Sequence, residues 1–82
     1  MIAPDLFLRN VLEGLVTIPE DLSIERTTDE MGVLLTVKVN KADMGKIIGK
    51  EGATAKAIRH LVNACGLSQQ EKVSVKILEP NR

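Results

Sequence analysis

One short stretch of the chain combines glycines and lysines in a way that suits contact with phosphate. Gly49 and Gly52 stand three residues apart, and Lys50 lies between them. Glycine has no Cβ and tolerates positive φ, so a backbone built from it can approach another molecule closely. Residues 53–65 follow with the pattern of an amphipathic helix, whose first N–H groups and positive dipole end attract anions. This stretch therefore predicts a phosphate-binding turn.

Basic side chains are concentrated around this turn. The 82 residues include 11 basic and 11 acidic side chains, which gives a formal net charge of zero. The first 37 residues carry two basic and seven acidic side chains, whereas residues 38–60 carry six basic and two acidic ones. A local anion site requires such segregation, although solvated lysines on helix faces would account for some of it. The six basic residues are Lys38, Lys41, Lys46, Lys50, Lys56 and Arg59.

The residues around the turn do not match the P-loop of nucleotide-hydrolysing enzymes. That motif needs four residues between two glycines, followed by Lys and by a Ser or Thr that holds Mg²⁺. Here three residues separate Gly45 from Gly49, and Glu51 stands where the hydroxyl is required. His60 is the only histidine, and no nucleophile or carboxylate pair near it would support catalysis. We therefore expect no enzyme activity, no metal site and no cofactor.

Composition favours a cytoplasmic protein. Cys65 is the only cysteine, so it can form no internal disulfide, and we expect it to be a buried apolar residue. No apolar run approaches the roughly 18 residues that span a bilayer. The N-terminus lacks the basic start and cleavage site of a signal peptide. We expect one domain at residues 1–82, with its core at about 4–78 and a frayed tail at 79–82.

Hydrophobic periodicity predicts the order helix–strand–strand–helix–helix–strand. The helices are expected at residues 4–16, 41–48 and 53–65, and the strands at residues 22–28, 33–40 and 72–78. Alternation in the central strand should turn one set of side chains toward the core. This set is Val33, Leu35, Val37 and Val39.

Several residues set the expected ends and faces of the helices. Asn40 is expected to cap the helix at 41–48, and Asp43 should complete a weak capping box. Gly66 stands where a left-handed residue would end the helix at 53–65. The face that this last helix buries is predicted to be Ile58, Leu61, Val62 and Cys65.

The connections predict the arrangement of the sheet. The first two strands should form an antiparallel hairpin across the tight connection at residues 29–32. The two-helix crossover from the second strand to the third should be right-handed, which makes these strands parallel if they are adjacent. The predicted fold class is α+β, with a three-stranded mixed sheet covered by helices on one face.

The sequence at the turn resembles KH domains, which clamp the backbone of about four nucleotides with a G-x-x-G loop. The resemblance lies in Ile47-Ile48-Gly49-Lys50-Glu51-Gly52 and in Ala53-Thr54-Ala55-Lys56-Ala57-Ile58-Arg59. The element order is similar to the prokaryotic, type II, KH arrangement. From about Leu8 to Leu78 the chain resembles the KhpA family of small bacterial single-KH proteins, most clearly in residues 19–24, 43–50 and 55–59.

This resemblance implies binding of single-stranded RNA with little sequence specificity. The two glycines of the loop would contact phosphates through the backbone, and Lys50 would add a charge-assisted contact. Ile47, Ile48 and the end of the central strand at Val37 and Val39 are candidates for an apolar floor beneath the bases, or for core packing. The implied RNA-binding residues are Gly49, Lys50, Glu51, Gly52, Lys46, Ile48, Ala53, Lys56 and Arg59.

Two residues depart from the pattern that is common in KH domains. Glu51 places a negative charge inside the loop, and Ala53 stands where relatives often carry a basic residue. Both departures should weaken RNA binding. Phe7 is the only aromatic residue, so stacking of bases on aromatic rings, on which RRM and OB-fold proteins depend, is essentially unavailable.

The resemblance also implies partners. Proteins of the KhpA type are expected to form homodimers, or heterodimers with a larger KhpB (Jag)-type KH protein. In that role they are expected to act as RNA chaperones that influence cell shape and cell wall biogenesis. Linking two weak sites raises the effective affinity without new contacts. The alternative is a protein-interaction module whose RNA contact is supplied mainly by the partner, and Glu51 and the zero net charge keep this hypothesis open.

Overall fold

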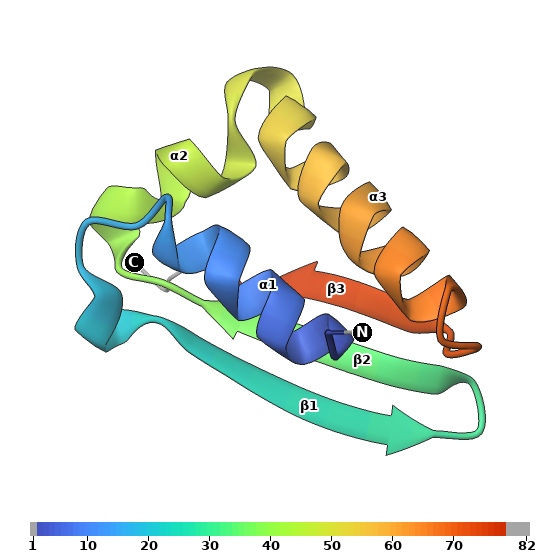
Figure 1. Ribbon diagram of the computed structural model, residues 1–82. Coiled ribbons are helices and arrows are strands. Elements are labelled where there is room, and N and C mark those ends of the chain that lie inside the picture. The colour runs from blue at the N-terminus through green and yellow to red at the C-terminus, as the bar shows by residue number, and fades with distance from the viewer. Residues whose placement is uncertain (1, 79–82) are drawn as a thin grey trace.

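The computed structural model describes residues 2–78, so the expected tail at residues 79–82 lies outside the described residues. The helices of these residues are α1 (Pro4–Glu13), α2 (Met44–Ile48) and α3 (Ala53–Leu67), and the strands are β1 (Ser23–Asp29), β2 (Gly32–Lys38) and β3 (Val73–Ile77). Short 3-10 turns lie at Pro19–Asp21, Lys41–Asp43 and Lys50–Gly52. None of the described helices is long and apolar enough to cross a membrane. The expected order of helices and strands is confirmed (Figure 1).

The strand β2 lies at the centre of the sheet. It pairs antiparallel with β1, and Asp29 stands opposite Gly32 where the hairpin turns. It pairs parallel with β3, and Val33 stands opposite Val73. The helices α2 and α3 connect β2 to β3, and together with α1 they cover one face of the sheet (Figure 1). The predicted α+β fold with a mixed three-stranded sheet is confirmed.

The core lies between the helices and the covered face of the sheet. The alternation predicted for the central strand is confirmed, since its four inward side chains are all buried. The same cluster includes Leu8 and Leu12 of α1, Ile47 of α2 and Ile58 and Val62 of α3. Burial of each such side chain contributes about 1.5–3 kcal/mol. The core therefore holds α2 and α3 over the sheet and positions the turn between them.

The first helix is shorter than predicted. The helix expected at 4–16 ends at Glu13, and Gly14 follows as its C-cap. Glycine has a low helix propensity, which favours an end at this position. Leu15 and Val16 still pack against the core after the helix has ended. The last three residues of the predicted helix therefore belong to a loop.

Asp43 does not complete a capping box, so that prediction was wrong. The Oδ1 atom of Asn40 accepts a hydrogen bond from the N–H of Ala42 at 2.8 Å, which confirms the cap itself. The Asp43 carboxylate is fully buried and accepts bonds from the Thr17 N–H at 3.0 Å, the Thr17 hydroxyl at 2.7 Å and the Ile18 N–H at 3.1 Å. The bond from the Thr17 N–H is the main cause that lowers the pKa of the Asp43 carboxyl below its usual value. Asp43 therefore ties the loop after α1 to the start of α2.

The helix α3 buries a face that differs from the predicted one. Ile58 and Val62 are buried as expected, but Leu61 is 50% exposed and Cys65 is only half-buried. Those two predictions were wrong, because the buried face of the helix is rotated about the helix axis relative to the predicted face. The buried residues of α3 are Ala55, Ile58, Val62 and Gly66.

Gly66 lies inside α3 and does not end it. The helix continues to Leu67, and the positive φ expected at its end occurs later, at Gln70, where φ is 61°. A Cβ on Gly66 would lie 2.6 Å from the Cγ2 atom of Val73. The absence of a side chain at Gly66 therefore allows α3 to approach β3 closely.

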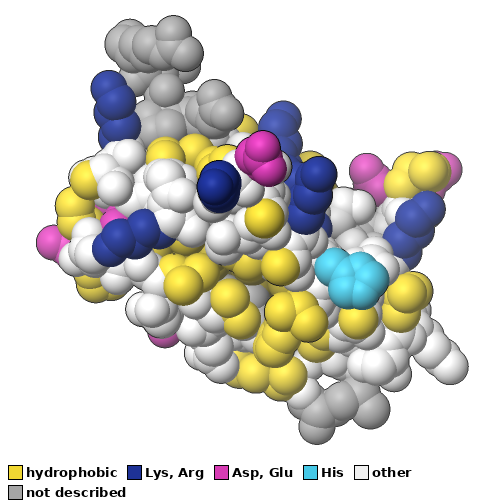
Figure 2. All heavy atoms as spheres, turned by 90° about the horizontal axis from the view of Figure 1, so that it is seen from above, with side chains coloured by type: hydrophobic (Ala, Val, Ile, Leu, Met, Phe, Trp, Pro, Cys, Tyr) yellow, Lys and Arg dark blue, Asp and Glu magenta, His cyan; other side chains and the backbone are white. Residues whose placement is uncertain are grey.

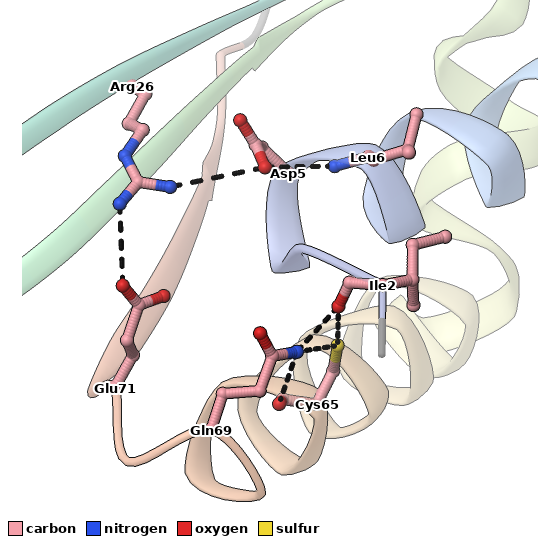
Figure 3. Close-up of polar contacts among 7 residues, drawn as sticks. All are labelled: Ile2, Asp5, Leu6, Arg26, Cys65, Gln69 and Glu71. Carbon is pink, nitrogen blue, oxygen red and sulfur yellow. Dashed lines mark hydrogen bonds and ion pairs between the residues drawn. The ribbon is translucent and has the colours of Figure 1, made fainter.

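The start of α1 is attached to two distant parts of the chain (Figure 3). A guanidinium nitrogen of Arg26 on β1 lies 3.9 Å from the carboxylate of Asp5, and another lies 3.5 Å from that of Glu71. The Nε2 atom of Gln69 donates to the carbonyl of Ile2. These contacts hold α1 against β1 and against the loop between α3 and β3.

Candidate nucleic-acid interface

At two positions of the turn between α2 and α3, the backbone has a conformation that only glycine readily adopts. Gly49 has φ 75° and ψ 177°, and Gly52 has φ 77° and ψ 10°. Between them, Glu51 takes the left-handed conformation with φ 55° and ψ 28°, which is uncommon for a residue with a side chain. The chain reverses direction within these residues, so their backbone forms an outer corner of the molecule (Figure 1).

The two glycines differ in their surroundings. A Cβ on Gly49 would lie 2.2 Å from Oγ1 and 2.6 Å from Cβ of Thr54, whereas a Cβ on Gly52 would meet nothing within 4 Å. Gly49 is therefore required both by its φ and by its contact with the first turn of α3. Gly52 is required by its φ alone, and the space beside it is open to a ligand.

The charged residues of the turn are exposed. Lys50 and Glu51 are exposed in the turn itself, Lys46 is exposed on α2, and Ala53 is exposed where α3 begins. Gly52 at the N-cap of α3 provides no side-chain hydrogen bond to the first turn of the helix. Figure 2 shows basic side chains gathered on this face of the molecule, with an apolar area alongside them. A backbone corner with cations and a helix start is suited to an anion.

A groove of about 410 Å³ lies between α3 and β3. Lys56 and Arg59 line it, so the structure places these two predicted residues in one concave site. Its other lining residues are His60, Asn63, Val73, Ser74 and Val75, none of which the sequence analysis assigned to the site. Lys56, Arg59, His60 and Asn63 all belong to α3. They stand at positions i, i+3, i+4 and i+7, a spacing that could have shown that they share one helix face. The contribution of β3 depends on the tertiary fold.

The apolar residues near the turn had two possible roles, a floor beneath the bases or core packing. Val37, Val39 and Ile47 are buried in the core, so of the two expected roles they have that of core packing and do not form a floor beneath the bases. Ile48 is half-buried beside the turn. These residues were candidates because their alternation and helical spacing are equally typical of a core, which is what they form.

The cations of the site are not paired within the described residues. The ion pairs among residues 2–78 involve Arg9 and Arg26, which lie on α1 and β1. The guanidinium of Arg59 donates from Nε to the carbonyl of Val75 at 3.4 Å, a neutral partner that leaves its charge uncompensated. No cluster of His, Cys, Asp and Glu within the same residues could hold a metal ion. The arrangement offers positive charge and backbone N–H groups to a polyanion.

The chain is similar to known proteins over most of its length. Residues 5–77 match the family described as KhpA/KhpB, KH domain. A protein of Clostridium perfringens is 41% identical over 68 residues, which cover 83% of this chain and 91% of the relative. A protein of Listeria monocytogenes is 44% identical over 72 residues, which cover 85% and 92%, and one of Bacillus subtilis is 39% identical over 70 residues, which cover 85% and 86%. Each of these relatives is named RNA-binding protein KhpA.

Proposed function

Because this chain belongs to the KhpA/KhpB family of KH domains, we propose that it binds single-stranded RNA through residues 49–52 and the groove beside them. The observation that carries this proposal is the glycine-bounded corner before α3, the helix whose Lys56 and Arg59 line the groove. Relatives of about 40% identity, whose length the match covers to 86% or more, are named for RNA binding, which supports the assignment. The proposed role is binding in the cytoplasm, with no chemical step.

The loop acts on the sugar–phosphate backbone of the RNA. The open space beside Gly52 lets a phosphate approach the main chain, and the exposed ammonium of Lys50 provides a charge-assisted hydrogen bond. Lys46 adds a second cation from α2. Contacts of this kind fix the position of the strand and carry no sequence information.

The groove receives the bases that follow the held phosphates. Its floor is the outer edge of β3 and its wall is α3. The only aromatic residue, Phe7, packs against the core on α1, so it cannot form a stacking platform in the groove. Base contact therefore depends on hydrogen bonds and aliphatic surface, which are weaker than the roughly 1–3 kcal/mol per base of aromatic stacking.

We infer weak binding by one copy of the chain. Glu51 opposes phosphate within the loop, and Ala53 provides no charge at the start of α3. With two or three phosphates contacted, the logarithm of the binding constant should fall with the logarithm of salt concentration with a slope of about −1.5 to −2. A micromolar dissociation constant, about −8 kcal/mol, is expected at best.

Filter binding of a single-stranded RNA at two salt concentrations tests the proposal. Lys50→Glu should weaken binding about fivefold to tenfold, because it reverses a charge beside phosphate. Lys38→Glu is the matched control, since Lys38 is an exposed lysine of β2 away from the turn. Equal effects of the two substitutions, or a nanomolar affinity with a steep salt slope, would contradict the proposed site.

A second candidate function is pairing with another protein, and an exposed apolar area favours it. Leu6 on α1 and Leu61 on α3 are each 50% exposed, and Leu67 at the end of α3 is 60% exposed. Figure 2 shows apolar side chains that form a continuous area across this face. We infer that a second copy or a larger KH protein of the KhpB type covers it. In this pairing, the proposed function includes RNA chaperone activity and an influence on cell shape and cell wall biogenesis.

A further inference from the structure

The strand β1 lies at one edge of the sheet, with β2 on its inner side (Figure 1). The N–H of Val33 on β2 donates to the carbonyl of Lys72 at 2.8 Å, so Val33 directs its main-chain groups toward β3. Successive residues of a strand direct these groups to opposite edges, so Leu34 directs its groups toward β1, where its partner is Thr27. The residues of β1 that alternate with Thr27, and therefore direct their main-chain groups outward, are Ile24, Arg26 and Thr28.

This outer edge of β1 is open. Within residues 2–78, no hydrogen bond reaches the outward main-chain groups of β1. The other edge of the sheet differs, because α3 lies beside β3 and its Asn63 and Arg59 bond to main-chain carbonyls there. Proteins usually block a free edge with proline, lysine, a bulge or a short strand. The strand β1 has seven residues, no proline or lysine, and an unbroken register with β2, so its edge can receive an added strand.

The charges around this edge are mainly negative. Arg26 is the only basic residue of β1, and its guanidinium lies 3.9 Å from the carboxylate of Asp5 and 3.5 Å from that of Glu71 (Figure 3). One cation between two carboxylates leaves a net negative charge. Glu25 and Asp29 on β1 are exposed, and neither forms an ion pair with another of the described residues. The edge therefore complements a strand that carries basic side chains.

We propose that the outer edge of β1 binds an extended, basic segment of another protein as an added strand. Main-chain hydrogen bonds to Ile24, Arg26 and Thr28 provide the affinity. Lysine or arginine side chains at alternate positions of the segment lie beside Glu25 and Asp29 and provide the preference for a basic sequence. This surface is separate from the candidate RNA site, and the proposal goes beyond the proposed function because it does not require RNA binding.

A second copy of the chain complements this edge less well than a basic segment does. Two β1 strands paired edge to edge would place Glu25 and Asp29 of both copies on the same face of the joined sheet. Like charges on neighbouring strands destabilise their pairing. Arg26 does not offset them, because Asp5 and Glu71 hold its guanidinium on the covered face (Figure 3).

An NMR titration with a synthetic peptide tests the proposal. The peptide is as long as β1, and lysine alternates with valine along it. The amide signals of Ile24, Arg26 and Thr28 should shift more than those of Glu25 and Thr27, because only outward N–H groups gain a hydrogen bond. Lysines that merely associate with acidic side chains would not produce this alternation. A peptide with glutamate in place of lysine should bind about threefold to tenfold more weakly at low salt.

Two further changes remove main-chain hydrogen bonds and keep the charges. N-methylation throughout the lysine peptide removes its donors, and Thr28→Pro removes an outward N–H of β1. Thr28 makes no main-chain bond to β2, and proline is tolerated at such positions of edge strands, so the variant should fold. Each change should weaken binding about tenfold, as expected for the loss of one or two hydrogen bonds. Thr28→Val is the matched control, since it keeps the N–H and should bind like the wild type.

Three results would overturn the inference. The first is the absence of shifts in β1 with the lysine peptide. The second is equal affinity for the lysine peptide and its N-methylated form, which would show association by charge without an added strand. The third is self-association of the wild-type chain, seen by sedimentation, that Thr28→Pro abolishes and Leu61→Asp does not, because the edge would then belong to a second copy. None of these measurements involves RNA, so failure of the proposed RNA binding would leave them unchanged.

Discussion

Glu51 places a carboxylate in the turn that is proposed to hold phosphate. It is exposed and takes a left-handed backbone conformation with φ 55°. Its neighbour Lys50 is exposed as well, so the two opposite charges lie side by side at the corner. Because these two charges act on a polyanion in opposite directions, their net attraction for it is small. We therefore expect the loop to bind RNA weakly.

Removal of this charge should strengthen RNA binding. Glu51→Gln keeps the size and the backbone of the residue, and it removes repulsion between an exposed carboxylate and phosphate. An exposed charge interaction of this kind corresponds to a gain in affinity of about twofold to fivefold at low salt. Filter binding measures it, and Glu25→Gln on β1 is the control. If Glu51→Gln weakened binding, the carboxylate would have to contact the RNA or order the loop.

The two glycines of the turn should differ in their effects on stability. Gly49→Ala would place a Cβ against Thr54 at a positive φ, and we expect the free energy of unfolding to fall by about 2–4 kcal/mol. A Cβ on residue 52 would lie in open space, so Gly52→Ala should lower the free energy of unfolding only by the cost of the left-handed backbone, about 1–2 kcal/mol. Urea unfolding compares them. Equal losses would mean that Thr54 moves aside without cost.

At the scale of elements, the buried carboxylate of Asp43 joins the loop after α1 to the start of α2. Its three hydrogen bonds come from Thr17 and Ile18, and they lower the pKa of the carboxyl in the folded chain. A group whose pKa is lower in the folded state stabilises that state above its unfolded pKa. The stabilisation is lost as the pH falls through the folded value.

Asp43→Asn should therefore destabilise the chain at neutral pH and lose this effect in acid. The amide turns an N–H group toward donors, so at pH 7 the variant should unfold at a lower urea concentration than the wild type. The difference should shrink as the pH falls below the ordinary carboxyl pKa of 3.8. Glu25→Gln, an exposed control on β1, should show no such change. A difference between wild type and variant that stays constant with pH would rule out the ionised carboxylate as the cause.

The elements were predictable from the sequence where one signal dominated. Alternation predicted the inward face of β2 correctly, whereas apolar spacing carried the first helix past Gly14, where it ends. The face of α3 was misjudged because Leu61 and Cys65 are as apolar as the residues that are buried. Gly66 was misjudged because a glycine that ends a helix and a glycine that permits close packing look the same in a sequence. Only the contact with Val73 separates the two roles.

The candidate site was predictable for the turn and not for the groove. The spacing of Gly49 and Gly52 with Lys50 indicated the corner, because local geometry alone decides it. The groove needs α3 and β3 side by side, and they are joined in space by packing of Gly66 against Val73. No local pattern gives the outer edge of β3 a role in binding. Helical spacing could have placed His60 and Asn63 on the face of Lys56 and Arg59, but only the tertiary fold shows that this face lines a groove.

At the scale of the whole molecule, one face carries both the basic site and the exposed apolar area (Figure 2). A small chain gains little stability from its own core, about 3–5 kcal/mol, so burial of this area against a partner would add to it. Pairing would also bring two weak RNA sites together and raise the effective affinity. The two proposed functions are therefore compatible in one assembly.

Leu61→Asp should prevent pairing and leave the chain folded. Leu61 is half exposed at the middle of α3, so a charge there is tolerated in one copy but would be buried in an assembly. Analytical ultracentrifugation should find a smaller species for the variant, alone or mixed with a larger KH protein. Leu34→Asp, on the uncovered face of the sheet and 37% exposed, is the control. If only the control changed the assembly, pairing would use the sheet instead of the helices.

The most direct test of the proposed site is an amide NMR titration of the chain with a short single-stranded RNA. We predict that the signals of residues 49–53 and of β3 shift together, that β1 changes little, and that the shifts disappear with Lys50→Glu. Shifts confined to β1 or to the uncovered face of the sheet would contradict the account, as would unchanged signals at residues 49–52 on saturation with RNA.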